Sequence, residues 1–405
     1  MRNIFSEKNQ NKSCVKEDGG EFKFHLNDCL ACSGCITDSE DIIGESKIDE
    51  IYNIKENVSF LISPQSKFSV YNYINLGEYS FEEFEDYLAF FLKEKYKVDK
   101  IFDTSHATKI IGEALILEEN KVISDCPGTV MYIERQAPHL VDKLSKILTA
   151  QQLLSNSIAK TIVISVVPCY DKKLEASEKD TNLNYVLTTY EFMNLLLKLN
   201  FKIQKTPYKC ANNEKFQMNI GMNTGGYLEY VLFEKYSENG IKDIKKKYTD
   251  LKTISTIHIR NNSKGKHIEK EKWTDLNNIK IDNIKKGVKY IYRRKSSGYF
   301  IYEFLVNGVK EVYIRINGVE NLINFMKETK SKEFTYKLVE IYICNFGCLN
   351  GPGQLNFEDI TNNIEMFRTY GNINTIETSF KTIENLKLRS FVKKEMKQVK
   401  FDVQW

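Results

Sequence analysis

The sequence predicts an α/β fold in which parallel sheets are flanked by helices. Short apolar runs at 57–63, 161–167 and 336–343 have the length and composition of buried strands. Segments with helical apolar spacing follow the first two runs, and both open with capping-box residues. Strands that alternate with helices are typical of a sheet with helices on both faces.

The first strand and helix lie between residues 57 and 96. "NVSFLIS" (57–63) is an apolar run bounded by Pro64. In "SFEEFEDYLAFFLKEKY" (80–96), Ser80 and Glu83 have the spacing of a capping box, which predicts that a helix begins there. The apolar positions that share one helical face are Phe81, Phe84, Leu88 and Phe91.

The same order recurs twice along the chain. "TIVISVV" (161–167) reads as a buried strand, and "TTYEFMNLLLKLN" (188–200) opens with Thr188 and Glu191 in capping-box spacing. "KEVYIRI" (310–316) then leads into the helical "VENLINFMKE" (319–328), and "YKLVEIYI" (336–343) is a further strand. No internal repeat is visible.

The composition limits the classes to which this protein can belong. A chain of 405 residues with 42% hydrophobic content can fold without disulfides, and its net charge of +4 (58 basic minus 54 acidic residues) does not favour a nucleic-acid partner. No apolar run approaches the ~18 residues of a membrane span, and "MRNIFSEKNQNKSC" lacks the apolar core of a secretory signal. We therefore expect an intracellular protein without a membrane partner, with reduced thiols.

Three of the nine cysteines form a compact run. Cys29, Cys32 and Cys35 are spaced C-x-x-C-x-x-C, and clustered thiols in a reducing compartment indicate a metal site or catalysis. Structural zinc usually takes two separated C-x-x-C pairs, whereas three thiols at successive spacing with a remote fourth, Cys14, suit an iron–sulfur cubane. Iron–sulfur is the favoured interpretation and zinc is the alternative.

A second group of cysteines follows the predicted strands. Cys126, Cys169 and Cys344 come directly after apolar runs, and Cys348 lies four residues beyond Cys344. Because ligands bind at the carboxyl ends of strands in α/β sheets, these four thiols could converge on one site. Each one alone could equally be a small apolar core residue, which is the interpretation we give to the remaining Cys210.

Several ordered motifs carry a family resemblance. "SDCPG" (124–128), "VPCYDKKLEA" (167–176), "TGGYLE" (224–229) and "EIYICNFGCLNGPGQ" (340–354) are similar to the cluster-binding signatures of iron-only hydrogenases. Together with "DCLACSGCIT" (28–37) and "SPQS" (63–66), they resemble more closely the hydrogenase-like assembly factors of cytosolic and nuclear iron–sulfur proteins, the Nar family.

The resemblance implies an organisation as well as a fold. It implies an N-terminal iron–sulfur module (1–55), a hydrogenase-like domain of two lobes with parallel sheets flanked by helices around a buried cluster (56–395), and a C-terminal recognition tail (396–405). It also implies two 4Fe-4S clusters. The N-terminal cluster would bind Cys14, Cys29, Cys32 and Cys35, and the deep cluster would bind Cys126, Cys169, Cys344 and Cys348.

The sequence departs from hydrogenases at the place where protons are relayed. The residue before the first deep cysteine is Asp125 where hydrogenases have a relay cysteine, Thr129 replaces a tryptophan, and Pro352 interrupts the glycine run. Lys172 and Glu175 keep the hydrogenase-like spacing after Cys169. The pocket is thus expected to survive in part, without the proton path.

These departures favour a non-enzymatic assembly factor over a hydrogen-converting enzyme. A two-cluster electron carrier is a third interpretation. The resemblance implies a cytoplasmic carrier or adaptor that serves cytosolic and nuclear proteins, which leaves the nucleus open as a second location. Its partners would be P-loop scaffold proteins and the propeller-containing targeting complex. The chain itself has no G-x-x-x-x-G-K-S/T motif, so an energy-driven step would belong to a partner.

The chain ends in "KQVKFDVQW", and a terminal tryptophan exposes apolar surface unless something covers it. Docking of Trp405 on its own fold is one interpretation. The resemblance favours the other, in which Trp405 binds the targeting complex, although Gln404 stands where a carboxylate is usual.

Two smaller features predict structure instead of chemistry. The five histidines have no ligand spacing, and only His25, four residues before Cys29, is near a candidate cluster. Gly225 and Gly226 predict the turn before a helix.

Overall fold

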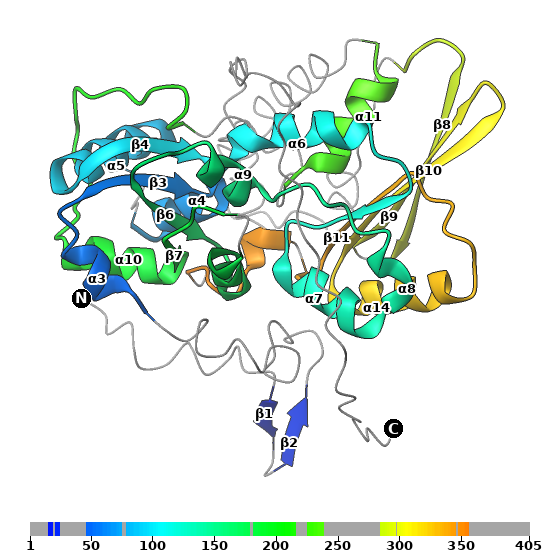
Figure 1. Ribbon diagram of the computed structural model, residues 1–405, viewed down its shortest axis with the longest axis horizontal. Coiled ribbons are helices and arrows are strands. Elements are labelled where there is room, and N and C mark those ends of the chain that lie inside the picture. The colour runs from blue at the N-terminus through cyan, green and yellow to red at the C-terminus, as the bar shows by residue number, and fades with distance from the viewer. Residues whose placement is uncertain are drawn as a thin grey trace, which may run out of the picture.

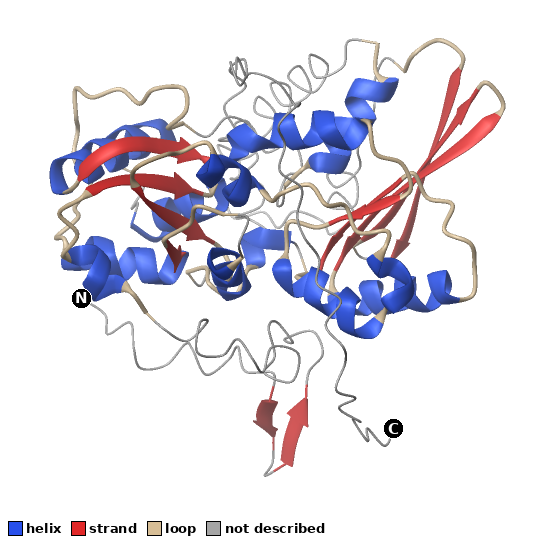
Figure 2. Cartoon of the chain, viewed as in Figure 1, coloured by secondary structure: helices blue, strands red, loops and turns tan. Residues whose placement is uncertain are grey.

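The computed structural model describes residues 15–18, 21–24, 46–74, 78–178, 181–215, 225–238, 284–296, 298–345 and 347–355. Most of these residues form two lobes, each built on its own sheet, and helices α6 (Ala107–Ile116), α9 (Ala150–Asn156) and α11 (Tyr227–Tyr236) lie between the sheets (Figures 1 and 2).

The sheet of the first lobe is parallel throughout. Its order is β4-β3-β6-β7, and its strands are β3 (Asn57–Ile62), β4 (Lys97–Asp103), β6 (Ile162–Val167) and β7 (Tyr185–Thr188). Its helices are α3 (Ile48–Tyr52), α4 (Pro64–Ile74), α5 (Phe81–Lys95) and α10 (Thr189–Lys198). The strands predicted at 57–63 and 161–167 are therefore confirmed.

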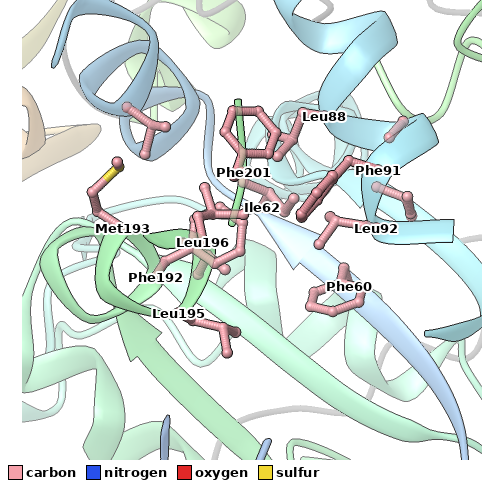
Figure 3. Packing of buried hydrophobic residues seen from close by; sticks show 14 of the residues in the cluster. Phe60, Ile62, Leu88, Phe91, Leu92, Phe192, Met193, Leu195, Leu196 and Phe201 are labelled. Carbon is pink, nitrogen blue, oxygen red and sulfur yellow. The ribbon is translucent and has the colours of Figure 1, made fainter. Parts of the chain in front are cut away.

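Both predicted capping boxes start helices of this lobe. The Glu83 N–H donates to Ser80 Oγ at 3.2 Å and the Ser80 N–H donates to the Glu83 carboxylate at 2.8 Å, so α5 begins at Phe81. Thr188 and Glu191 do the same for α10. Figure 3 shows Leu88, Phe91 and Leu92 of α5 and Phe192, Leu195 and Leu196 of α10 gathered around Phe60 and Ile62 of β3.

The sheet of the second lobe is mixed, which differs from the predicted parallel arrangement. Its order is β5-β11-β10-β9-β8, with β5 (Lys121–Ile123), β11 (Leu338–Tyr342), β10 (Val309–Asn317), β9 (Tyr299–Val306) and β8 (Val288–Ser296). Only β5, β11 and β10 are parallel. Strands β9 and β10 are joined through Asn307 and Gly308, which have φ values of 50° and 82°. Such a two-residue turn can join only antiparallel strands.

Three helices and three 3-10 segments complete the description of the lobes. The helices not yet given bounds are α7 (Pro127–Gln136), α8 (Pro138–Val141) and α14 (Val319–Lys330), and the 3-10 segments are η4 (Thr104–His106), η5 (Tyr170–Ser177) and η7 (Gly347–Asn350). Gly226, at φ 73°, precedes α11, which confirms the predicted turn.

One apolar core joins the two sheets. It contains Leu61 of β3 and Val163 of β6 on one side and Tyr302 and Phe304 of β9 on the other, with side chains of α6 and α11 packed among them. Because these buried side chains belong to one cluster, burial of apolar surface connects the lobes.

The termini contribute little to the described structure. Strands β1 (Val15–Asp18) and β2 (Glu21–Phe24) form an antiparallel pair, while Cys14, Cys29, Cys32, Cys35 and Trp405 lie outside the described residues. Among the described residues, no helix combines the length and the apolar character that crossing a membrane requires.

Candidate functional site

Four cysteines of the predicted deep set lie at the ends of strands or just beyond them. Cys126 follows β5 and caps α7, Cys169 follows β6 and precedes η5, Cys344 follows β11, and Cys348 lies in η7. All four are free thiols; three are buried and Cys348 is partly buried. Cys169 belongs to the first lobe, and the other three belong to segments that continue from the second.

The four thiols form one group. Cys126 and Cys344 share a buried cluster against which Cys348 packs. Cys169 interacts electrostatically with Cys126 and Cys344, and Cys348 interacts with Cys126. The convergence predicted from the strand ends is therefore seen in the positions of these side chains.

Burial controls the protonation of these thiols. Loss of water raises the pKa of Cys126, Cys169 and Cys348 above the ordinary thiol value, and the nearby Asp171 carboxylate adds to the effect at Cys126 and Cys169. In the absence of a metal, this burial favours the neutral thiol form of Cys126, Cys169 and Cys348. Because metals bind thiolates, loading an iron–sulfur cluster here would release protons.

The donor set suits a cluster better than a single ion. In the described part of the chain, no three or more Cys, His, Asp or Glu side chains form a group that could hold one metal ion. A cubane places a different demand on the protein, since each of four thiolates binds its own iron. Four thiols from three segments of the chain, three of them buried, match that requirement.

Hydrogen bonds tie the cysteine segments together. The Cys126 N–H donates to Ser124 Oγ at 3.2 Å, and the Ser124 hydroxyl donates to the Ile341 carbonyl at 2.5 Å. The Ile343 N–H donates to Thr129 Oγ1 at 3.0 Å. Thr129, which stands where hydrogenases have tryptophan, thus holds the strand that carries Cys344. Sequence reasoning noted Thr129 only as a departure and missed Ser124.

Glycines let the loop after Cys348 reach the first lobe. A Cβ on Gly351 would lie 2.3 Å from the Pro168 carbonyl oxygen, and one on Gly353 would lie 2.9 Å from the side chain of Thr188. The Gly353 N–H donates to the Pro168 carbonyl at 3.0 Å. The two glycines therefore let the loop lie against Pro168, beside Cys169, and against Thr188.

A buried charged group borders the thiols. Lys172 Nζ lies 3.1 Å from Asp125 and 3.6 Å from Glu175. Burial lowers the pKa of Lys172, but the carboxylates of Asp125 and Glu175 and the thiol of Cys348 more than offset it, so the pKa is raised overall. Lys172 is therefore a fixed positive charge, held between Asp125 and Glu175.

Asp125 and Glu175 are also held by neighbouring groups. The Ala150 N–H donates to Asp125 at 3.2 Å, and the Thr149 hydroxyl and Gln151 amide donate to Glu175 at 2.7 and 2.5 Å. The carboxylate that replaces the relay thiol is thus fixed in an ion pair with Lys172.

A small cavity opens beside Cys348. The space available to the centres of water molecules is about 40 Å³, enough for about three waters. It is lined from both lobes by Ser63, Pro64, Gln65, Thr104, Ser105, Thr108, Asp125, Ala150, Gln151, Val167, Pro168, Lys172, Gly225, Tyr227 and Cys348. The "SPQS" and "TGGYLE" motifs therefore meet at the site.

Comparison with known proteins decides the family. The family described as "Iron only hydrogenase large subunit, C-terminal domain" matches residues 56–352. A cytosolic Fe-S cluster assembly factor NAR1 from Encephalitozoon cuniculi is 30% identical over 89% of this chain and 88% of its own length. The chain belongs to the hydrogenase-like NAR1 family. A NAR1 from Kluyveromyces lactis is 26% identical over 83% of this chain and 77% of that protein.

Solved structures support the fold of this NAR1 family member. An apo [FeFe]-hydrogenase HydA1 variant from Chlamydomonas reinhardtii matches with a TM-score of 0.52 at 17% identity, covering 82% of this chain and 88% of that one. The predicted hydrogenase-like α/β fold is therefore confirmed.

The remaining cysteine and a histidine are structural. Cys210 is buried in the core of the first lobe and its thiol donates to the Glu85 carbonyl at 3.2 Å, while burial raises its pKa. His106 is buried, with Nε2 2.8 Å from the Asn212 carbonyl oxygen. Neither residue lies among the four clustered thiols.

Proposed function

We propose that this chain acts as a cytosolic iron–sulfur cluster assembly factor, a non-enzymatic carrier or adaptor that binds two 4Fe-4S clusters. The observation that carries the proposal is the group of four thiols between the lobes, three of them buried, in a chain whose relatives bear the name of such factors. Clients would be cytosolic and nuclear iron–sulfur proteins, which places the chain in the cytoplasm and leaves the nucleus as a second location.

The deep cluster would bind Cys126, Cys169, Cys344 and Cys348. A bound cubane supplies one-electron redox chemistry. The chain's own residues would enclose it: Lys172 provides a nearby positive charge, and the glycine loop closes on Pro168. Because three of the thiols are buried, we expect this cluster to be retained.

The N-terminal cluster would bind Cys14, Cys29, Cys32 and Cys35, all four outside the described residues. The C-x-x-C-x-x-C spacing supports this set, because three closely spaced thiols with a remote fourth suit a cubane. A cluster on a short polar segment would be accessible to partners, so transfer, if the chain performs it, would start here.

Metal analysis tests the two sites. A chain reconstituted without oxygen should hold about eight iron and eight sulfide, because each cubane has four of each. Cys169→Ser and Cys348→Ser should each leave about four iron, since an incomplete ligand set loses its cluster. Cys210→Ser is the matched control and should keep about eight. Normal iron content in Cys169→Ser, or zinc in place of iron, would contradict the proposed sites.

Hydrogen turnover tests the main alternative, an iron-only hydrogenase. Asp125 stands in the place of the relay thiol and is paired with Lys172 at 3.1 Å, so we expect no hydrogen evolution or uptake with a strong reductant and hydrogenase maturation factors present. Sustained turnover, or carbonyl and cyanide infrared bands, would establish the hydrogenase function. Electron transfer to a client without delivery of iron would favour the electron carrier.

Deletion of Trp405 tests whether the chain acts as an adaptor that binds the propeller-containing targeting complex and P-loop scaffolds. Burial of a terminal indole in a partner pocket is worth on the order of 2 to 4 kcal/mol, or roughly a 30- to 1000-fold change in Kd. Deletion of Trp405 should weaken binding to the targeting complex and leave iron content and Tm unchanged. If Trp405 docks on its own fold, deletion lowers Tm and leaves that binding intact.

A further inference from the structure

Strands β8, β9 and β10 form an antiparallel meander whose inner face belongs to the core. Tyr290 of β8 stacks on Phe304 of β9 with ring centroids 4.9 Å apart, and Tyr236 of α11 stacks on the same ring at 3.8 Å. Tyr302 and Tyr313 are fully buried on this face. Because side chains alternate along a strand, the residues between these aromatics point to the opposite face.

That opposite face, here called the meander face, is both apolar and basic. Register places Lys289, Leu305 and Lys310 side by side in one row, and Ile291, Glu303 and Val312 in the next. Ile291 is 51% exposed and Leu305 is 38% exposed. A pair of neighbouring aliphatic side chains is thus presented to solvent between basic ones.

Positive charge dominates the meander face. Glu303 is an acidic residue on this face, and its carboxylate is already paired with Arg293 at 3.1 Å and with Lys310 at 2.6 Å. Along the adjoining sequence from 285 to 296, six residues are basic and none is acidic: Lys285, Lys286, Lys289, Arg293, Arg294 and Lys295. Of these, Lys295 is paired with Glu328 of α14, and register places Arg294 on the inner face, so Lys289 and Arg293 supply the charge of β8 on the meander face. An approaching anionic group would therefore meet a net positive surface.

The strand that carries most of these charges is at the edge of the sheet. In the part of the chain that the structure describes, β8 is paired on one side only, with β9. An edge strand leaves a row of backbone N–H and C=O groups that another extended chain can pair with.

We propose that the meander face and the β8 edge bind an extended, acidic protein segment that also carries aliphatic side chains. Charge complementarity attracts the segment, pairing along β8 aligns it, and Ile291 and Leu305 receive its apolar side chains. A second copy of this chain does not fit, because two such faces repel each other. A nucleic acid would gain little from Ile291 and Leu305, whose apolar surface has no phosphate to contact.

Basic residues on an edge strand can also serve only to prevent aggregation. That role would explain Lys289 and Arg293, since charge on an edge discourages strand pairing. It would not explain why Ile291 and Leu305 are exposed, because exposed aliphatic side chains promote association. The experiment below separates the two roles.

The test measures binding of a fluorescein-labelled peptide of alternating glutamate and valine, about twelve residues long, to the full cluster-loaded chain. Fluorescence anisotropy at low salt should show saturable binding that weakens as salt is raised. The triple variant Lys289→Glu, Arg293→Glu, Lys310→Glu should weaken binding at least about tenfold. The double variant Ile291→Ser, Leu305→Ser should weaken it about fivefold and keep its salt dependence.

A matched triple variant at exposed lysines of the first lobe, Lys55→Glu, Lys97→Glu and Lys100→Glu, changes the net charge equally and should bind within about twofold of the parent chain. Glutamine in place of glutamate at Lys289, Arg293 and Lys310 provides a second set if charge reversal disturbs folding. Iron content and Tm report folding in every variant and do not depend on the peptide.

Amide hydrogen exchange identifies where on the chain the peptide binds. Bound peptide should slow exchange of the amides of 288–296, because strand pairing protects edge N–H groups. Absence of binding, equal loss in both triple variants, or protection elsewhere would each overturn the proposal. Tighter binding of a single-stranded oligonucleotide than of the acidic peptide would overturn it in favour of a nucleic-acid surface.

Discussion

Asp125 is the residue at which this chain departs most clearly from hydrogenase chemistry. Its carboxylate pairs with Lys172 at 3.1 Å and accepts a hydrogen bond from Ala150, and it interacts electrostatically with Cys348. A thiol at this place could exchange a proton with a ligand in the cavity. A carboxylate locked to a buried ammonium instead adds fixed negative charge beside the proposed cluster ligands.

This charge should influence the reduction potential of the deep cluster. Asp125→Asn removes a negative charge, which makes addition of an electron less unfavourable, so we expect the potential to rise on the order of 50 mV. Lys172→Met should lower it, because a positive charge is lost. A redox titration followed by electron paramagnetic resonance, in a Cys32→Ser background that leaves one cluster, measures both. Shifts of the same sign in the two variants would contradict the charge argument.

His106 should make stability depend on pH. Burial lowers its pKa below 6.5, although Asp103 and the hydrogen bond to Asn212 act in the other direction. As pH falls below about 6.5, the unfolded chain takes up a proton that the folded chain does not, so the stability present above that pH is lost. The contribution between pH 7.5 and 6.0 is at most about 0.8 kcal/mol.

Substitution of His106 by Gln should remove that contribution. The free energy of unfolding, measured with urea at both pH values, should fall less on acidification in His106→Gln than in the parent chain. An unchanged pH dependence would show that His106 is not the group responsible.

A buried ion cluster fixes α4 against α5 and β4. Lys67 of α4 is fully buried and lies 2.9 Å from both Glu85 of α5 and Asp103 of β4. Burial lowers the pKa of Lys67, but the two carboxylates raise it further, so the ammonium stays charged. Asp103 also accepts hydrogen bonds from Ser105, which lines the cavity. The cluster therefore positions one wall of the site.

Lys67→Met should destabilise the first lobe by about 3 to 5 kcal/mol, because it leaves two buried carboxylates without their cation. Urea unfolding checks this value. Lys337→Met is the control: Lys337 pairs with the exposed Glu119 at 2.9 Å, so its loss should cost less than about 1 kcal/mol. Adding Glu85→Gln and Asp103→Asn to Lys67→Met should recover part of the loss. Equal effects of Lys67→Met and Lys337→Met would contradict the argument.

The loop after Cys348 depends on glycine at 351. A Cβ there would lie 2.3 Å from the backbone oxygen of Pro168, so Gly351→Ala must move the loop or the segment that carries Cys169. We expect the free energy of unfolding to fall by about 1 to 3 kcal/mol. The deep cluster should also be lost, which removes about four iron per chain. Gly287→Ala is strained by the φ of 87° at that position, but a Cβ there meets nothing within 4 Å, so this variant should keep its iron. Full iron content in Gly351→Ala would show that the loop does not constrain the site.

Local signals explain which elements the sequence could predict. Ser80 with Glu83 and Thr188 with Glu191 are short-range patterns, and both start helices where expected. The antiparallel half of the second sheet was not predicted, although Asn307 and Gly308 form a recognisable hairpin turn. That signal was available from the residues and was overlooked.

Contacts between distant segments were harder to predict. The convergence of four cysteines followed from the rule that ligands gather at strand ends. The hydrogen bonds of Ser124 to Ile341 and of Ile343 to Thr129 span more than 200 residues, and no local pattern predicts them. The same holds for Lys67, whose partners lie on two other elements.

The two lobes of the molecule are joined at two places. The apolar core around α6 and α11 connects the sheets, and the proposed cluster ligands connect the lobes at a second place, since Cys169 comes from the first lobe and Cys126 and Cys344 come from the second. The core does not depend on metal, because it is held by apolar burial. The thiol group depends on metal in part: hydrogen bonds such as that from the Gly353 N–H to Pro168 hold the segments, and a bound cluster would add links between the thiols themselves.

Removal of the clusters should therefore loosen one junction and spare the other. In the chelator-treated chain, amide hydrogen exchange should quicken in 124–130, 168–176 and 347–354, while β3 and β6 keep their protection because the apolar core encloses them. Cys169→Ser should show the same pattern with its N-terminal cluster still bound, which separates the deep site from the N-terminal one. Faster exchange throughout both sheets would mean that the metal holds the whole fold, and unchanged exchange would mean that the four thiols do not connect the lobes.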